Sequence, residues 1–279
     1  MIPAQRNPVQ IVKMSGAGND FIVLGAEDRA RIGEGLIPWT RRACRRGLSV
    51  GADGVLIVEG VEPGRVRMRY LNADGTPAFC GNGSRCAARF AFLSGLAGET
   101  MTLLTDAGEM PARIEGDRVH VSMPRPDEPL AHQLELDSRT VAGQRVLAGV
   151  PHFVTFVDDL PNAPLQQLGP GLRAHPSFGA DGTNVNLVQW LDDGHLGVRT
   201  FERGVEGETL SCGSGALAAA WGARLHDLSG SVRVTPTSGV DLEIVYPDPE
   251  HGPEFIRLSG EARVVFRATV DGEASRGFE

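Results

Sequence analysis

The sequence predicts an α+β fold of two pseudo-symmetric domains, each a curled, mostly antiparallel, barrel-like sheet around a central buried helix. Three observations lead to this prediction: a cysteine motif that occurs twice, other landmarks that recur at nearly the same offset, and two helices that are apolar nearly all round. A chain of 279 residues is long enough for two domains of ordinary size.

The cysteine motif opens two alanine-rich segments. Cys80 is followed by Gly-Asn-Gly and Cys212 by Gly-Ser-Gly, 132 positions later (212 − 80). Gly18 and Gly149 each lead into an apolar run and are 131 positions apart (149 − 18), while residues 53–58 resemble residues 183–188 at an offset of 130. Three landmarks in one order at nearly one offset indicate two homologous halves.

Prolines mark the boundary between these halves. Pro124, Pro126 and Pro129 interrupt the apolar periodicity, and such residues are typical of connecting segments. We therefore predict a first half over residues 1–126 and a second over 127–263, with a C-terminal strand within 264–279 completing the first half.

Hydrophobic periodicity and turn residues predict the elements of each half. In the first half we expect helices over 38–46, with Pro38 in the first turn and Gly47 as a cap, and over 84–96, ending near Gly98. The expected strands are 10–14, 21–24, 54–59, 65–71, 101–105, 109–115 and 118–123. In the second half we expect strands 144–148, 153–157, 185–189, 197–202, 231–236, 241–245, 255–259 and 261–270, with helices near 165–168 and over 216–226.

The helices that follow the two cysteines have almost no polar face. Residues 86–93 and 216–223 are rich in alanine, phenylalanine, leucine and tryptophan, so each helix must be buried on most sides. This places each cysteine at the N-terminus of a buried helix. Unpaired N–H groups and the helix dipole there lower the pKa of a thiol and bind a carboxylate, and the flanking glycines let a ligand approach the backbone.

Two such helix tips facing each other would hold the carboxylate of an amino acid with one sulfur on each side of its α-carbon. One thiolate would take the α-proton while the opposite thiol delivers one, which inverts the stereocentre. No pyridoxal-type cofactor is required if hydrogen bonds spread the carbanion's charge into the carboxylate. The alternative is that both cysteines are inert core residues, but a core cysteine needs no Gly-x-Gly after it.

Cys44 and Cys86 lack a glycine cradle, and we expect both to be inert. The sequence has no Cys-x₂-Cys pair and no histidine cluster, so we predict no metal site.

A net charge of −8 argues against a nucleic-acid or anionic-membrane surface, and the basic run 41–46 is interpreted as a solvated helix end. The sequence contains no stretch of 18 apolar residues, so we expect no membrane-spanning helix. Residues 1–13 lack the apolar core of a signal peptide. Four cysteines in so long a chain suit a protein of the reducing cytoplasm.

Together, these motifs resemble the diaminopimelate epimerase family over almost the whole chain. The matching segments are 13–21 (Lys-Met-Ser-Gly-Ala-Gly-Asn-Asp-Phe), 72–75 (Asn-Ala-Asp-Gly), 80–86 (Cys-Gly-Asn-Gly-Ser-Arg-Cys), 151–152 (Pro-His), 182–186 (Gly-Thr-Asn-Val-Asn), 202–204 (Glu-Arg-Gly), 208–209 (Glu-Thr) and 212–215 (Cys-Gly-Ser-Gly). The resemblance implies a cofactor-independent epimerase that interconverts L,L- and meso-diaminopimelate in lysine and peptidoglycan-precursor synthesis. It also implies a cytoplasmic homodimer that closes over its substrate.

The resemblance also implies a role for individual residues. The two bases would be Cys80 and Cys212, Glu202 would meet the reacting amino group, and Glu202 and His152 would tune the thiols. The carboxylate at the reacting centre would bind the backbone of Gly81, Asn82, Gly213 and Ser214. The distal amino-acid end would be held by Asn19, Asn72, Asn184 and Arg203, the last as a bidentate partner.

Two positions depart from the family's commonest pattern. Gly54 stands where many members have glutamine, and Val150 where many have asparagine before Pro-His. Both differences remove side-chain hydrogen bonds near the distal end of the substrate, which bears on how the substrate is held and not on the two-thiol chemistry.

Three other functions are open to a chain with these motifs. A proline or hydroxyproline racemase would have histidine after the first Cys-Gly and aspartate before the second cysteine, whereas this chain has Asn82 and Ser211 and keeps Arg203 for a second carboxylate. A thiol redox protein would oxidise Cys80 and Cys212 to a disulfide, but Cys-x₂-Cys is absent. A non-catalytic binding module would have no reason to retain both cysteines.

Overall fold

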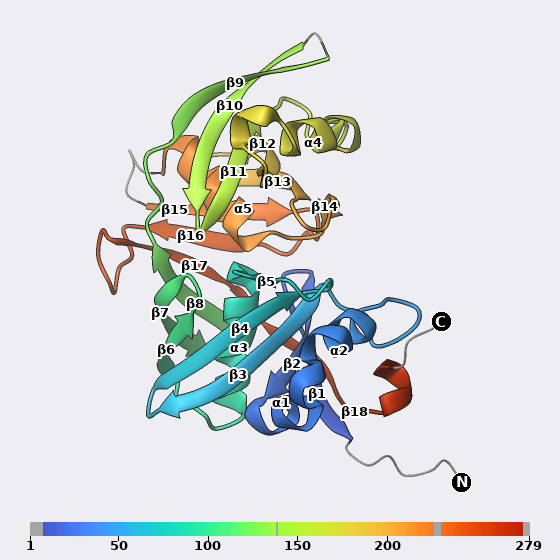
Figure 1. Cartoon of the computed structure of the whole chain (residues 1–279). Coiled ribbons are helices and arrows are strands. Elements are labelled where there is room, and N and C mark those ends of the chain that lie inside the picture. Colours follow the sequence, from blue (N-terminus) through green and yellow to red (C-terminus); the bar gives the residue numbers. More distant parts are fainter. Residues whose placement is uncertain (1–7, 138, 226–229, 276–279) are drawn as a thin grey trace. The chain divides into compact units, whose positions relative to one another are not determined.

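The computed structural model of the chain describes residues 8–137, 139–225 and 230–275 (Figure 1). It divides into two compact units, one of Met1–Val119 with Glu261–Glu279 and the other of His120–Gly260. The fold is α+β and consists mostly of strands, as the sequence predicts. Among the described helices, none has the length and apolar character needed to cross a membrane. The division into homologous halves at residue 126 stays a prediction.

The first unit is a curled sheet with one helix inside it. Its strands follow the order β18–β1–β2–β3–β4–β6–β7, with β2/β3 and β4/β6 parallel and the other neighbours antiparallel. The strands are β1 (Val9–Gly16), β2 (Asn19–Gly25), β3 (Gly54–Glu62), β4 (Arg65–Asn72), β5 (Pro77–Ala78), β6 (Thr100–Thr105), β7 (Gly108–Glu115) and β18 (Arg263–Val270). Helix α3 (Gly81–Leu93) packs against β1, β2, β3, β4, β6 and β7, which makes it the central helix of this unit.

The second unit repeats this topology. Its strands follow the order β9–β10–β11–β12–β13–β15–β16–β17, with β11/β12 and β13/β15 parallel. The strands are β9 (Leu130–Leu136), β10 (Arg139–Ala148), β11 (Val150–Phe156), β12 (Asn184–Asp192), β13 (His195–Glu202), β14 (Gly207–Thr209), β15 (Gly230–Pro236), β16 (Leu242–Tyr246) and β17 (Phe255–Glu261), while β8 (Arg118–Pro124) spans the sequence boundary between the units. Helix α5 (Gly213–Ala220) packs against β10, β11, β12, β13, β15 and β16.

Strand register identifies equivalent positions in the two units. Phe21 lies opposite Gly54 in the parallel pair β2/β3, as His152 lies opposite Asn184 in β11/β12. The antiparallel pairs repeat the match, because Leu56 faces Tyr70 and Asn186 faces Thr200. Phe21, Leu56 and Tyr70 of the first unit therefore correspond to His152, Asn186 and Thr200 of the second.

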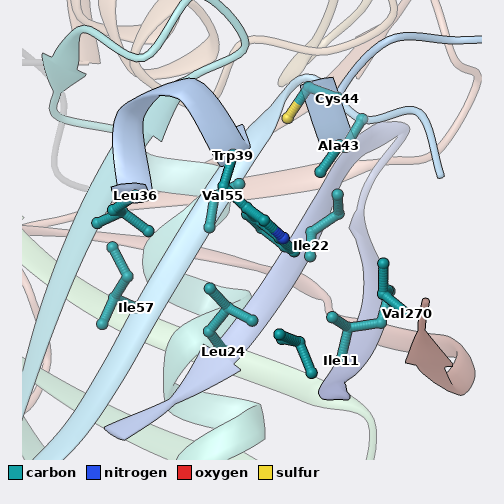
Figure 2. Close-up of a cluster of buried hydrophobic side chains, with 12 residues drawn as sticks. Ile11, Ile22, Leu24, Leu36, Trp39, Ala43, Cys44, Val55, Ile57 and Val270 are labelled. Carbon is teal, nitrogen blue, oxygen red and sulfur yellow. The ribbon is translucent and has the colours of Figure 1, made fainter. Parts of the chain in front are cut away.

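Short helices cover the outer face of each sheet. In the first unit, α1 (Ala26–Ile32), a 3₁₀ turn (Gly33–Gly35) and α2 (Leu36–Ala43) follow β2, and Trp39 of α2 packs on Ile22 and Val55 of the sheet, as Figure 2 shows. In the second unit, α4 (Leu165–Arg173) packs on β12 and β13 through Leu165 and Leu172. The remaining 3₁₀ turns are Pro176–Phe178 and Gly272–Ser275.

Two predicted helix ends are wrong, and a third cannot be compared. Helix α2 stops at Ala43, with Cys44 as its C-cap, so Arg46 lies outside the helix and Gly47 does not cap it. Helix α3 runs over Gly81–Leu93, because Gly95 with a φ of 70° turns the chain well before Gly98. Helix α5 ends at Ala220 and continues as a π-helical turn (Trp221–Leu225), and the predicted last residue, His226, lies outside the described residues. The predicted C-terminal strand is β18, which ends at Val270, and residues 276–279 are likewise not described.

Candidate active site

Cys80 is the N-cap of α3. Its backbone is extended (φ −143°, ψ 111°), and its Sγ accepts a hydrogen bond of 3.3 Å from the backbone N–H of Gly83. The thiol in turn donates to Asn19 Oδ1 at 3.4 Å. The backbone donor and the positive end of the helix dipole favour a thiolate at this position, whereas the hydrogen bond to Asn19 Oδ1 favours the protonated thiol.

Asn19 is oriented by an acidic side chain on the next strand. Its Nδ2 donates to Asp53 Oδ2 at 2.6 Å, which leaves Oδ1 directed at Cys80, while Nδ2 of Asn82 lies 3.5 Å from the same oxygen. Arg46 donates to Asp53 Oδ1 at 2.8 Å and also pairs with Asp20. Burial raises the pKa of Asp20, but hydrogen bonds from Arg46 and Lys13 outweigh it and hold that pKa below its usual range.

Asn72 lies apart from this cluster in its hydrogen bonding. Its Nδ2 donates to Thr76 Oγ1 at 3.0 Å, and its backbone N–H donates to Thr76 O, so it closes the turn that follows β4. Gly75 enters this turn with a φ of 82°, a conformation that glycine adopts without strain. By register, Asn72 is paired with Gly54 on β3.

Gly54 sits where no side chain fits. A Cβ at this position would come within 2.3 Å of Leu71 O and 2.4 Å of Tyr70 Cε2. Tyr70 occupies the space, donates to Asp53 O at 3.2 Å and packs edge-on against Phe21 at 5.7 Å between ring centroids. Glycine at this position therefore makes room for an aromatic ring packed beside it.

Cys212 is the N-cap of α5 and matches Cys80 in backbone conformation (φ −122°, ψ 111°). Its carbonyl accepts the hydrogen bond from Ala216 N–H that starts the helix, and its Sγ lies 3.5 Å from Ser214 Oγ. Gly213 and Ser214 form the first turn, as Gly81 and Asn82 do in α3. Both predicted carboxylate-binding backbone segments thus lie at helix N-termini.

His152 on β11 is buried, with 1% of its surface exposed. Asn186 Nδ2 donates to His152 Nδ1 at 3.0 Å, and Thr200 Oγ1 donates to Asn186 Oδ1 at 3.0 Å. Burial lowers the pKa of His152 to about 3, aided by the positive charge of Arg203 and opposed by the Asn186 hydrogen bond. His152 is therefore neutral at physiological pH.

Asn184 and Arg203 are connected through the backbone. Asn184 Oδ1 accepts a hydrogen bond of 2.8 Å from the Arg203 N–H, just beyond Glu202 at the end of β13. Among the residues that the structure describes, the Arg203 guanidinium forms no ion pair. Its positive charge contributes to the lowered pKa of His152. The second unit therefore brings Asn184, His152 and Arg203 into one neighbourhood.

The other two cysteines differ from Cys80 and Cys212 in both place and chemistry. Cys86 lies within α3 and is fully buried, and Cys44 follows α2 with 4% of its surface exposed. Burial raises the pKa of each thiol to about 12. Neither is a usable base near neutral pH.

A comparison with known protein families decides what kind of protein has this geometry. The family profile described as "Diaminopimelate epimerase" matches residues 11–127 and 145–265, which include both cysteine motifs. The chain belongs to the diaminopimelate epimerase family. The two matched segments also include both central helices, α3 and α5.

Relatives of known name agree with this membership in the diaminopimelate epimerase family. Diaminopimelate epimerase of Hydrogenobaculum sp. (strain Y04AAS1) is 37% identical over 278 residues, covering 94% of this chain and 99% of that protein. The diaminopimelate epimerase of Aquifex aeolicus (strain VF5) is 35% identical over 274 residues, covering 94% and 97%. Among solved structures, a probable proline racemase from Agrobacterium radiobacter K84 aligns with a TM-score of 0.71 over 96% of this chain and 95% of that one; at 17% identity it shows a shared fold alone.

Two polar residues of this family member, Asp53 and Asn186, contact predicted site residues although sequence patterns assign them no role, and a third, Thr200, contacts Asn186. Asp53 binds Asn19, Asn186 binds His152, and Thr200 binds Asn186. The repeat offset of 130 already aligned residues 53–58 with 183–188, so it pointed to β3 and β12 as equivalent strands. Which of their side chains turn toward the site depends on strand register, and a sequence pattern does not give this.

Proposed function

We propose that this chain is an isomerase that interconverts L,L- and meso-2,6-diaminopimelate without a cofactor, using Cys80 and Cys212 as its two bases. The reaction would serve lysine and peptidoglycan-precursor synthesis. The observation that carries the proposal is the equivalent placement of the two cysteines. Each caps the N-terminus of the buried central helix of its unit, in the same extended conformation and ahead of a glycine-containing first turn.

Epimerisation requires a proton to leave one face of the α-carbon and another to arrive at the opposite face. In the proposed step, one cysteine thiolate takes the α-proton and becomes a thiol, and the electron pair of the broken C–H bond passes toward the substrate carboxylate. The thiol of the other cysteine then delivers its proton to the carbon and becomes the thiolate. Protons and charge balance, and the reverse reaction uses the same two groups in exchanged roles.

The carbanion is the high-energy species that the protein must stabilise. Backbone N–H groups at the start of α3 and α5 are the donors for the substrate carboxylate, whose negative charge grows in the transition state. Glu202 would accept a hydrogen bond from the α-ammonium group, which keeps the substrate protonated at nitrogen and makes its α-proton more acidic. His152 and Glu202 would adjust the proton affinity of the thiols.

The distal end of diaminopimelate carries a second carboxylate and a second ammonium group. We assign the carboxylate to Arg203, whose fork of N–H groups suits a bidentate contact, and place Asn184 beside it as a further polar partner. Asn19 and Asn72 would complete this end from the first unit.

We also propose that the enzyme works in the cytoplasm as a homodimer. Sedimentation velocity of the full chain would test the dimer, and a monomer at all concentrations would reject it.

Proton NMR of the reduced protein with L,L-diaminopimelate in D₂O tests the function directly. Formation of the meso isomer with deuterium at the α-carbon is the expected result. Cys80→Ala and Cys212→Ala should each abolish isomer formation while the fold is kept, and Cys44→Ala should remain active as a matched control. Full activity of either Cys80→Ala or Cys212→Ala would reject the two-base mechanism. No exchange by folded, reduced wild-type enzyme would reject the substrate, with proline and hydroxyproline tested next.

A further inference from the structure

We propose that Thr200 and Asn186 are positioning residues that hold His152 as a neutral imidazole with its proton on Nε2, so that the ring offers a fixed hydrogen-bond donor to negative charge in the Cys212 half of the site. The inference rests on the proposed function, because it describes how that half-site is set for the reaction. It concerns three side chains that form a buried chain across β13, β12 and β11.

The hydrogen-bond directions determine the tautomer. Asn186 Nδ2 is an amide donor, so His152 Nδ1, 3.0 Å away, must accept and has no proton of its own. The orientation of the Asn186 amide is fixed on both sides, since Nδ2 also lies 3.4 Å from Phe153 O and Oδ1 accepts from Thr200 Oγ1 at 3.0 Å. A flipped amide would set two oxygens against each other. A neutral ring without a proton on Nδ1 has its proton on Nε2.

Burial makes this arrangement rigid. Asn186 has none of its surface exposed, His152 has 1% and Thr200 has 4%, so water does not compete for these bonds. Within the described residues, His152 Nε2 is buried and has no hydrogen-bond partner. A buried N–H without an acceptor is unfavourable, which points to an acceptor that arrives with the ligand or forms during the reaction.

The fold itself does not require this polar chain. The equivalent positions of the first unit are Phe21, Leu56 and Tyr70, which pack as an apolar and aromatic layer around the same kind of central helix. One sheet register therefore accommodates either type of layer. The polar version in the second unit has a chemical role that the apolar one does not.

The two units also supply different groups from equivalent strands, β2 in the first unit and β11 in the second. Asn19, at the start of β2, contacts Cys80 through its amide oxygen, but its counterpart at the start of β11 is Val150. Two residues further along, the polar side chain is in the second unit instead, because the first unit has Phe21 and the second has His152. The first unit thus has an amide at the start of this strand, and the second unit has an imidazole two residues further along.

Gly215 connects the chain of side chains to the cysteine motif. A Cβ at Gly215 would lie 2.5 Å from Asn186 Oδ1 and 3.1 Å from Thr200 Oγ1, so the Asn186–Thr200 pair packs directly against the first turn of α5, the turn that Cys212 caps. In the first unit, a Cβ at Gly83 would instead contact the side chains of Leu56 and Met68. The second glycine of each motif therefore makes room for the layer beneath it, and in the second unit that layer sets the histidine.

Nitrogen NMR of ¹⁵N-histidine-labelled enzyme measures the tautomer, with the His152 signals assigned by their loss in His152→Gln. The expected wild-type result is an unprotonated Nδ1 and a protonated Nε2. Thr200→Val, which keeps the shape of the side chain, should weaken this preference, and Asn186→Asp should reverse it because a carboxylate accepts from Nδ1–H. Wild-type His152 with its proton on Nδ1 would overturn the proposal.

Kinetics of the same variants test whether the tautomer matters for the reaction. Thr200→Val and Asn186→Asp should lower kcat by about tenfold to a hundredfold, with KM for diaminopimelate within about threefold, as for a misplaced catalytic group. Thr200→Ser should restore most of kcat. Thr155→Val is the matched control, since it removes a buried β-strand hydroxyl of the same unit that donates only to Ala142 O, and it should stay active. Unchanged kcat in folded Thr200→Val and Asn186→Asp would overturn the proposal.

The two readouts separate this inference from the proposed function. Wild-type enzyme with the expected tautomer but no epimerisation of diaminopimelate would reject the function and support the tautomer assignment. Active wild-type enzyme with the opposite tautomer would reject the inference and leave the function standing.

Discussion

Asp53 Oδ2 accepts a hydrogen bond of 2.6 Å from Asn19 Nδ2, and this bond decides which end of the Asn19 amide faces Cys80. A carboxylate can only accept hydrogen bonds, so the amide NH₂ group of Asn19 must point to Asp53 and its amide oxygen must point to the thiol of Cys80. Arg46 holds Asp53 from its other oxygen at 2.8 Å. Asp53 thus helps to organise the first half-site without contacting the sulfur itself, because it acts through Asn19.

Replacing Asp53 should reduce activity without removing either base. We expect Asp53→Ala to lower kcat/KM by about tenfold to a hundredfold, because Asn19 loses its fixed orientation. Asp53→Asn keeps an oxygen that accepts from Asn19 and should fall between wild type and Asp53→Ala. Steady-state kinetics with diaminopimelate measure this, and equal activity of Asp53→Ala and wild type would contradict the proposed orientation of Asn19.

Gly54→Ala should destabilise the protein. The added methyl would meet the Leu71 carbonyl at 2.3 Å, and a backbone atom in the middle of a sheet moves little, so we expect a loss of about 3 kcal/mol in the free energy of unfolding. Gly60→Ala, on the same strand, is the control, because its Cβ would make an ordinary contact of 3.6 Å with Leu96. Urea denaturation of both variants distinguishes them, and similar midpoints would refute the steric explanation of Gly54.

The sequence was sufficient to predict the features that depend on local pattern and repetition. The apolar helices behind the cysteines predicted two central helices, and Cys80 and Cys212 are indeed their N-caps. Elements with little buried surface escaped detection. Helix α1 has no buried residue, and β9 has one, Leu134, so neither produces a clear hydrophobic period.

The side-chain network of the site could not be predicted from the sequence. Asn186 belongs to a segment that the sequence marked as a motif, but its partners His152 and Thr200 are 34 and 14 positions away and meet it only through strand pairing. Tyr70 fills the place beside Gly54 for the same reason. Register is a property of the folded sheet, and a shift of one residue would turn each of these side chains to the other face.

Stability should depend on pH through His152. Its pKa is lowered to about 3 in the folded protein, whereas an exposed histidine has a value near 6.5, so the unfolded chain binds the proton first as the pH falls. The free energy of unfolding is therefore unaffected by this group above about pH 7, and it decreases as the pH falls from about 6.5 toward 3. Between pH 7 and pH 5, wild type should lose about 2 kcal/mol more than His152→Gln.

Urea denaturation at both pH values measures this difference. The comparison with His152→Gln cancels the other titrating groups, which both proteins share. Parallel losses in wild type and variant would show that His152 is protonated as easily in the folded protein as in the unfolded chain, and would contradict its burial as a neutral ring.

Alkylation should distinguish the two pairs of cysteines. With a pKa of about 12, the thiols of Cys44 and Cys86 are ionised to only about one part in ten thousand at pH 8, and iodoacetamide reacts with the thiolate. We expect native enzyme to be modified at Cys80 and Cys212, with loss of activity, and protected there by diaminopimelate. Peptide mass spectrometry locates the modified residues, and denatured enzyme should react at all four cysteines. Rapid modification of Cys86 in native enzyme would contradict its burial inside α3, and with it the position of that helix at the centre of the unit.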